Sequence, residues 1–178
     1  MAFEKMKGAF GYKNKMAAPR LQKVVINVGT GTGIKKDKNR NEFISGRLEK
    51  ITGQKPALRG SKKSVASFKV RQGDPIGVMT TIRGKRMFAF VEKLVNVTLP
   101  RTKDFRGISR TVVDDIGNMT MGIKEHTIFP ETADEDIKDV FGFAITLVSS
   151  AKTKKEGTTF FELLGIPFKT EEDSKKKK

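Results

Sequence analysis

The fold class is decided by residues 64–83, which read SVASFKVRQGDPIGVMTTIR. Side chains alternate along residues 65–70, and residues 76–83 are rich in β-branched and apolar side chains, so each segment predicts a strand. Residues 71–75, Arg-Gln-Gly-Asp-Pro, have the composition of a turn. Two such strands joined by this turn predict an antiparallel hairpin with a long tip.

The remaining chain alternates loosely between helical and extended patterns. Periodicity predicts helices at residues 3–10, 42–52, 87–97 and 153–164, and strands at residues 23–28, 119–123 and 140–148. Gly53 is expected to cap the second helix, Pro100 to end the third, and Phe68, Phe88 and Phe90 to lie in the core. Residues 30–41 and 101–118 are expected to be irregular. The pattern favours an α+β fold over a strictly parallel α/β fold.

Length and composition favour one domain over residues 1–168, followed by a lysine-rich tail at residues 169–178 that is expected to be disordered. The chain has no cysteine, which excludes disulfides and thiolate chemistry. No apolar stretch approaches the length of a membrane span, and the start lacks a signal-peptide pattern.

Positive charge is concentrated in the first part of the chain. The formal net charge is +16, and residues 1–71 hold 18 Lys and Arg against 4 Asp and Glu, whereas residues 72–168 hold 13 of each. Residues 50–73 contain seven basic side chains and no acidic one. This distribution predicts a surface that binds a polyanion, and nucleic acid is favoured over an anionic membrane because glycines and a proline interrupt the run.

Catalytic and metal-binding patterns are weak. His126 is the only histidine and is expected to be a surface or packing residue. The acidic groups at residues 114–115 and 131–139 are interpreted as a solvated loop and a helix start rather than Mg²⁺ sites. Residues 29–33, Gly-Thr-Gly-Thr-Gly, lack both the dinucleotide and the P-loop patterns, although their amides could meet an RNA phosphate. We therefore expect no cofactor, no metal and no enzyme activity.

Several ordered motifs resemble the family of bacterial large-ribosomal-subunit protein five. The resemblance covers about residues 10–168 and is carried by Val24-Val25-Ile26-Asn27, Thr52-Gly53-Gln54-Lys55-Pro56, Lys62-Lys63-Ser64-Val65-Ala66, Phe68-Lys69-Val70-Arg71-Gln72-Gly73, Pro75-Ile76-Gly77, Thr81-Ile82-Arg83-Gly84, Leu99-Pro100-Arg101, Asp104-Phe105-Arg106-Gly107, Gly122-Ile123-Lys124-Glu125, Ile128-Phe129-Pro130-Glu131 and Leu163-Leu164-Gly165-Ile166-Pro167-Phe168.

The resemblance implies a structural protein of the cytoplasmic ribosome. It implies an antiparallel sheet with helices on one face and a concave face that binds 5S rRNA in the central protuberance. Its implied partners are 5S rRNA, large-subunit rRNA, the P-site tRNA and neighbouring ribosomal proteins, one of them in the small-subunit head, with no membrane contact. The candidate rRNA-binding residues are Asn27, Gln54, Lys55, Lys62, Lys63, Thr81 and Arg83. The hairpin tip at residues 64–74 would lie near tRNA, through Ser64, Lys69, Arg71 and Gln72.

Two other classes of function remain open from the residues alone. A basic architectural protein would prefer duplex DNA over folded RNA. The docking domain of an RNA-modifying enzyme would carry a similar basic surface but would need a catalytic constellation, and the sequence offers none.

Overall fold

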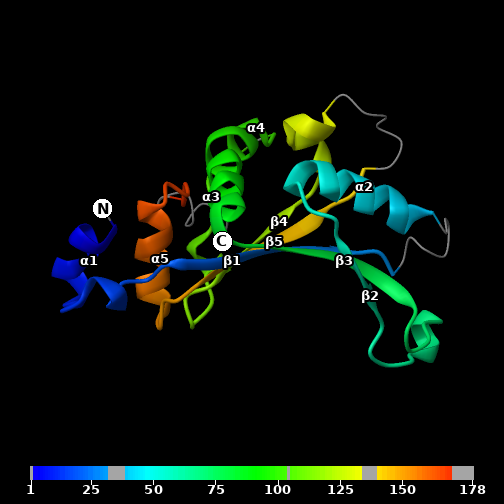
Figure 1. Ribbon diagram of the computed structural model, residues 1–178, viewed down its shortest axis with the longest axis horizontal. Coiled ribbons are helices and arrows are strands. Elements are labelled where there is room, and N and C mark those ends of the chain that lie inside the picture. Colours follow the sequence, from blue (N-terminus) through cyan, green and yellow to red (C-terminus); the bar gives the residue numbers. More distant parts are fainter. Residues whose placement is uncertain (1, 32–38, 104, 134–139, 170–178) are drawn as a thin grey trace, which may run out of the picture. The chain divides into compact units, whose positions relative to one another are not determined.

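The computed structural model describes residues 2–31, 39–103, 105–133 and 140–169. These residues form an α+β fold with an antiparallel sheet, which confirms the predicted fold class. The strands lie in the order β2-β3-β1-β5-β4 (Figure 1). Their bounds are β1 Leu21–Gly29, β2 Ala57–Gly60, β3 Pro75–Ile82, β4 Met119–Ile123 and β5 Phe143–Ser149.

The helices lie close to the predicted positions. Their bounds are α1 Ala2–Phe10, α2 Arg40–Thr52, α3 Gly84–Lys93, α4 Leu99–Arg101 and α5 Lys154–Leu163, with a π-helical segment, Leu94–Thr98, between α3 and α4. Short 3₁₀ turns occupy Lys15–Ala17, Ala66–Phe68, Arg110–Val112, His126–Ile128 and Pro130–Thr132.

The chain divides into two compact units. One comprises Met1–Val24, Arg83–Met121 and Thr146–Lys178, and the other, here called the hairpin unit, comprises Val25–Ile82 and Gly122–Ile145. Strands β1, β4 and β5 each contribute residues to both units. The single domain over residues 1–168 stays a prediction.

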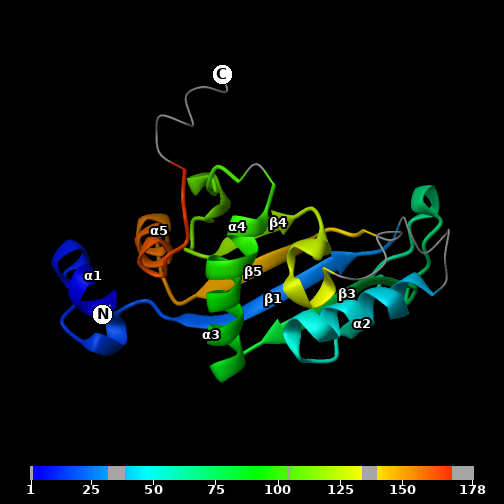
Figure 2. The same cartoon turned by 90° about the horizontal axis from the view of Figure 1, so that it is seen from above.

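In the hairpin unit, α2 packs on one face of the sheet against β3 (Figure 2). Its buried side chains Ile44, Leu48 and Ile51 recur at helical spacing, so they form one apolar stripe. Gly53 ends α2 as predicted, because its φ of 66° is readily adopted only without a Cβ, and its N–H donates to the Glu49 carbonyl at 2.7 Å.

The predicted hairpin is present, but its first strand was placed wrongly. The partner of β3 is β2, Ala57–Gly60, and residues 66–68 form a 3₁₀ turn in place of the predicted strand. Only Val65 and Val70 make a β-bridge there. Side chains alternate along residues 65–70, but none of them is buried, so burial does not hold this segment as a strand. In addition, Lys69 adopts a left-handed φ of 51°, which is incompatible with a regular strand.

The predicted helix at residues 87–97 begins earlier, at Gly84, and the helical path runs past Pro100 to Arg101. Proline lacks the N–H that would continue an α-helical ladder. The helical path nevertheless continues through Pro100, because the wider π-helical turn of Leu94–Thr98 precedes α4 directly.

In the unit that contains α5, α1 packs against that helix. The Tyr12 hydroxyl donates to the buried Glu156 carboxylate, which also accepts from the Lys152 N–H at 2.7 Å. The same helix approaches the turn before β4 closely at Gly157. A Cβ built there would lie 2.6 Å from the Cα of Gly117 and 2.8 Å from its carbonyl oxygen.

We therefore expect Gly157→Ala to lower the free energy of unfolding by about 1–3 kcal/mol, because backbone atoms must move apart to admit the methyl group. The matched control is Gly46→Ala on α2, where nothing lies within 4 Å of the added Cβ. The control should raise stability by about 0.5–1 kcal/mol through helix propensity. Urea denaturation measures both. An equal change in the two variants would contradict the close approach at Gly157.

Candidate nucleic-acid interface

One face of the sheet in the hairpin unit is buried and the other is open. Along β1, Ile26 and Val28 are 0% and 1% exposed, whereas Asn27 between them is exposed. Along β3, Thr80 and Ile82 are buried and Thr81 between them is half-buried. Because successive strand residues point to opposite faces, Asn27 and Thr81 lie on the open face of two neighbouring strands.

Arg59 also belongs to this open face. It pairs directly with Gly77 of β3, so the two residues share a face. Gly77 and Thr81 are four residues apart on β3, so they point to the same face of the sheet. Arg59, Gly77 and Thr81 therefore lie on one side. Gly77 itself is buried, and a Cβ there would lie 3.3 Å from the Val28 carbonyl oxygen and 3.8 Å from the Arg59 Cβ. Arg59 was part of the basic run but was not among the predicted site residues; the strand register identifies it.

Gln54 and Lys55 lie in the connection between α2 and β2 and not on a strand. The Thr52 hydroxyl ties the backbone of Gln54 to the end of α2, because it accepts from the Gln54 N–H at 3.3 Å while its single proton lies between the Leu48 carbonyl at 2.7 Å and the Gln54 carbonyl at 3.0 Å. Gln54 is half-buried and Lys55 is exposed. The side chain of Lys55 is thus available to solvent directly before the edge strand begins.

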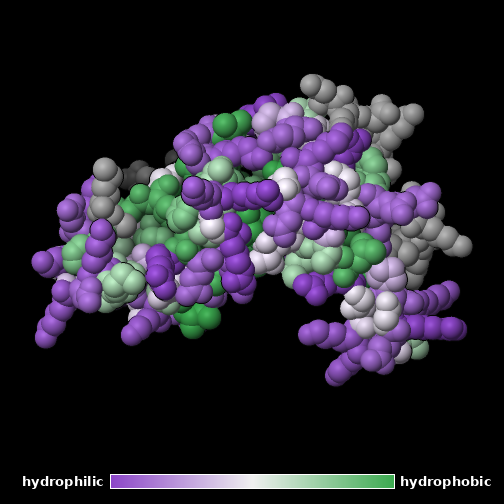
Figure 3. All heavy atoms as spheres, in the orientation of Figure 1, coloured by the Kyte–Doolittle hydropathy of each residue, from purple (hydrophilic) through white to green (hydrophobic). Residues whose placement is uncertain are grey.

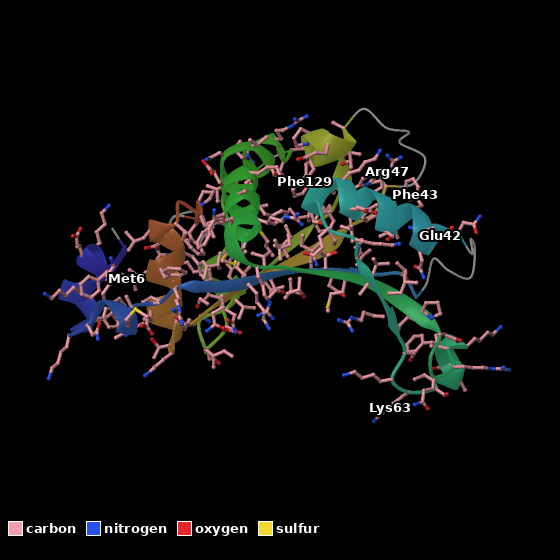
Figure 4. All side chains as sticks on the ribbon, in the orientation of Figure 1. Met6, Glu42, Phe43, Arg47, Lys63 and Phe129 are labelled. Carbon is pink, nitrogen blue, oxygen red and sulfur yellow. The ribbon has the colours of Figure 1, made fainter. Side chains whose placement is uncertain are left out.

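The connection between β2 and β3, residues 61–74, is here called the basic tip. It carries the predicted residues Lys62, Lys63, Ser64, Lys69, Arg71 and Gln72, and all six side chains are exposed. Figure 3 shows hydrophilic side chains over much of this part, and Figure 4 shows Lys63 on the tip, away from Phe43 and Arg47 of α2. None of the four cations in the tip forms an ion pair with an acidic residue of the described ranges.

Two phenylalanines do not lie where the sequence predicted. Phe68, expected in the core, is 67% exposed at the basic tip, and Phe88 is 56% exposed on α3, whereas Phe90 is buried as expected. The spacing of Phe68 matches a strand, but no second layer made of described residues covers the tip. An exposed aromatic side chain among cations offers a flat surface for a nucleic-acid base.

Arg83 follows β3 directly and precedes α3, where it is exposed. It belongs to the unit that contains α5 and not to the hairpin unit. Its assignment to RNA binding stays a prediction.

His126 is a packing residue, one of the two roles expected. It is 1% exposed, and its ring stacks on Phe141 with centroids 4.3 Å apart and planes 7° apart. Burial lowers the pKa of His126, and the positive charge of Arg47 lowers it further. Arg47 lies over the ring of Phe43, which in turn meets Phe141 edge-on.

Among the described residues, no group of three or more His, Asp and Glu is placed to hold a metal ion. In the same part of the chain, no helix has the length and apolar character to span a membrane. Residues 32–33 of the glycine-rich stretch, most of the acidic region and the tail from residue 170 lie outside the described residues.

Known proteins match nearly the whole chain. The family described as Ribosomal protein L5 matches residues 14–71, and the family described as the C-terminus of the same ribosomal proteins matches residues 75–168. The large ribosomal subunit protein uL5 of Halothermothrix orenii is 47% identical over 92% of this chain and 91% of its own length. That of Desulfatibacillum aliphaticivorans is 48% identical over 93% and 92%, and that of Desulforamulus reducens is 49% identical over 89% and 87%.

The fold, the charge distribution and these matches define the class as ribosomal proteins of the large subunit. Within that class, the chain belongs to the ribosomal protein L5 family, and it is a structural protein and not an enzyme. The resemblance seen in the ordered sequence motifs is confirmed.

The burial of His126 predicts a pH dependence of stability. Its folded-state pKa is lowered from 6.5, so the unfolded chain binds a proton more readily than the folded chain. The contribution of neutral His126 is fully present above pH 6.5 and is lost as the pH falls through the folded-state pKa. Because there is a single histidine, its NMR ring signals report this group alone. A titration midpoint at or above 6.5 would contradict the expected burial effect.

Proposed function

We propose that this chain is a structural constituent of the large ribosomal subunit that binds 5S rRNA and anchors it in the central protuberance. There it lies near the P-site tRNA and the contact to the small-subunit head. The observation that carries the proposal is that the hairpin unit displays uncharged polar side chains and basic side chains on adjoining surfaces. An open sheet face displays the uncharged side chains of Asn27 and Thr81, and the adjoining stretch of residues 50–73 is basic, largely exposed and free of acidic side chains.

Affinity would come from the cations. Lys55, Lys62 and Lys63 are exposed, so each can approach a phosphate without losing an ion pair within the described chain. Each phosphate they neutralise releases condensed counterions, which favours binding at low salt and makes affinity fall as salt rises. These contacts position the protein on RNA but do not distinguish one folded RNA from another.

Discrimination would come from the open face. The amide of Asn27 and the hydroxyl of Thr81 can both donate and accept hydrogen bonds, and Gln54 adds a second amide next to β2. These groups match the 2′-hydroxyls and base edges of folded RNA. Arg59, exposed on the neighbouring edge strand β2, adds a cation beside these polar groups. A rigid sheet holds the donors at fixed spacing, and this favours an RNA whose shape presents partners at that spacing.

The basic tip supports a second contact. Lys69, Arg71, Ser64 and Gln72 are exposed on a segment that projects beyond the paired part of β2 and β3, and Phe68 adds an aromatic surface. A ligand reached by this tip would be an RNA with accessible phosphates and at least one unstacked base. The elbow of the P-site tRNA has this chemistry. Large-subunit rRNA and a protein of the small-subunit head would complete the set of partners.

The proposal is tested by comparing three ligands in a salt series: 5S RNA, an unrelated folded RNA of equal length and duplex DNA. We expect a preference for 5S RNA that persists as salt rises, while all affinities fall with a log–log slope of about 0.7–0.9 per phosphate neutralised. Fluorescence anisotropy with labelled ligands measures each dissociation constant. Equal affinities for all three ligands would overturn the proposal, and a preference for duplex DNA would indicate an architectural DNA-binding protein.

Single substitutions separate affinity from discrimination. Asn27→Ala should reduce the preference for 5S RNA over the unrelated RNA about fivefold or more, the equivalent of one lost hydrogen bond. Gln54→Ala should act in the same direction. Lys62→Ala should weaken both RNAs by a similar factor and lower the salt slope by about one phosphate. The control is Lys152→Ala, an exposed lysine of the other unit, which should change neither quantity beyond a small general charge effect. An unchanged preference in Asn27→Ala would show that the open face does not read the RNA.

A further inference from the structure

The basic tip has no hydrophobic core of its own. Residues 57–75 are exposed apart from Ser61 and Val70, which are half-buried. Burial of apolar surface therefore contributes little to the conformation of this segment, and its order depends on hydrogen bonds between its own groups.

The tip contains a connected set of such bonds. Val65 and Val70 exchange backbone hydrogen bonds of 2.9 and 3.2 Å. Nearer to the paired strands β2 and β3, Ser61 donates its N–H to the Asp74 carbonyl at 2.9 Å, and the Ser61 carbonyl accepts from the Gly73 N–H at 3.0 Å. Between these two anchors lie residues 71 and 72, whose N–H groups are bound by side chains.

Asp74 closes the turn that follows Val70. Its carboxylate accepts a hydrogen bond from the Arg71 N–H at 2.7 Å, and its own N–H donates to the Arg71 carbonyl at 3.2 Å. The Ser64 hydroxyl accepts from the next N–H, that of Gln72, at 3.0 Å. Asp74 thus fixes the backbone of Arg71 from both of its ends.

Charge alone gives no reason for an acidic residue at this place. Asp74 is the only acidic residue in residues 50–74, and a carboxylate beside Lys69 and Arg71 weakens the field that attracts a phosphate. A bonded carboxylate can nevertheless strengthen RNA binding if it lowers the entropic cost of ordering the cations when they bind.

We propose that Asp74 is a positioning residue for RNA binding: through the Arg71 N–H it holds the backbone of Arg71, and with it this cation beside Lys69, in a preformed arrangement that meets RNA phosphates. The inference rests on the proposed function, because it assumes that the basic tip binds RNA. It adds a role for the one acidic residue of the tip, and it predicts that the hydrogen bond accepted by this residue favours binding of a polyanion.

Two substitutions separate geometry from charge. Asp74→Asn and Asp74→Ala both remove the negative charge, but only Asn keeps an oxygen that can accept from the Arg71 N–H. The probe is a folded tRNA transcript, and anisotropy on the full-length chain measures its dissociation constant. We expect Asp74→Ala to bind about fivefold more weakly than Asp74→Asn, through loss of one hydrogen bond. If charge alone mattered, both variants would bind more tightly than the parent and equally well.

The control pair is Asp115→Asn and Asp115→Ala, at an exposed acidic residue of the other unit. These two variants should bind the probe equally. A second control repeats the Asp74 substitutions in a Lys69→Ala/Arg71→Ala background. There the difference between Asn and Ala should vanish, because the positioned cations are absent while the backbone N–H of residue 71 remains.

Amide exchange of the free protein supplies a readout that does not involve RNA. The Arg71 amide should exchange more slowly in the parent and in Asp74→Asn than in Asp74→Ala, with the melting temperature of the chain unchanged. Equal binding by Asp74→Asn and Asp74→Ala, or equal exchange at Arg71, would overturn the inference. A parent chain without preference among 5S RNA, unrelated RNA and duplex DNA would instead overturn the proposed function, which is a different result.

Discussion

The two-residue period of β1 and β3 is the constraint on which the hairpin unit depends. Ile26, Val28 and Ile82 are buried on the face that α2 covers, and this fixes the register of both strands. A shift by one residue would turn these apolar side chains outward and Asn27 and Thr81 inward. The burial that stabilises the sheet therefore also determines which polar groups its open face displays.

The basic tip obeys a different constraint. Beyond the paired part of β2 and β3 there is no second layer over the described residues, so Phe68 and the cations stay exposed, and the conformation depends on polar contacts. Mutual repulsion of Lys62, Lys63, Lys69 and Arg71 opposes a compact tip. The hydrogen bonds that Ser64 and Asp74 accept from the backbone N–H groups of Gln72 and Arg71 counter that repulsion. Clustered cations in the basic tip favour binding of a polyanion, but in its absence their repulsion disfavours an ordered tip.

The sequence predicts the fold class and most elements because their signals are local. Gly53 caps α2 as expected, and β4 has the predicted bounds, Met119–Ile123. β2 was missed because four exposed residues after Pro56 show no alternation, and its pairing with β3 is a long-range contact. Phe68 and Phe88 were assigned to the core because spacing along a chain does not reveal whether a second layer exists. Of the candidate site, the residue types could be predicted, whereas the common face of Asn27, Arg59 and Thr81 required the strand register.

The central claim is that the open sheet face with the adjoining basic segment, and not another basic surface, binds 5S RNA. Lysine acetylation followed by mass spectrometry tests it on the intact chain with and without the RNA. Lys55, Lys62 and Lys63 should lose reactivity in the complex. Lys152, Lys154 and Lys155, before and at the start of α5, are also exposed in the free protein and should keep their reactivity. Protection of the α5 lysines with unchanged reactivity at Lys55, Lys62 and Lys63 would contradict the claim.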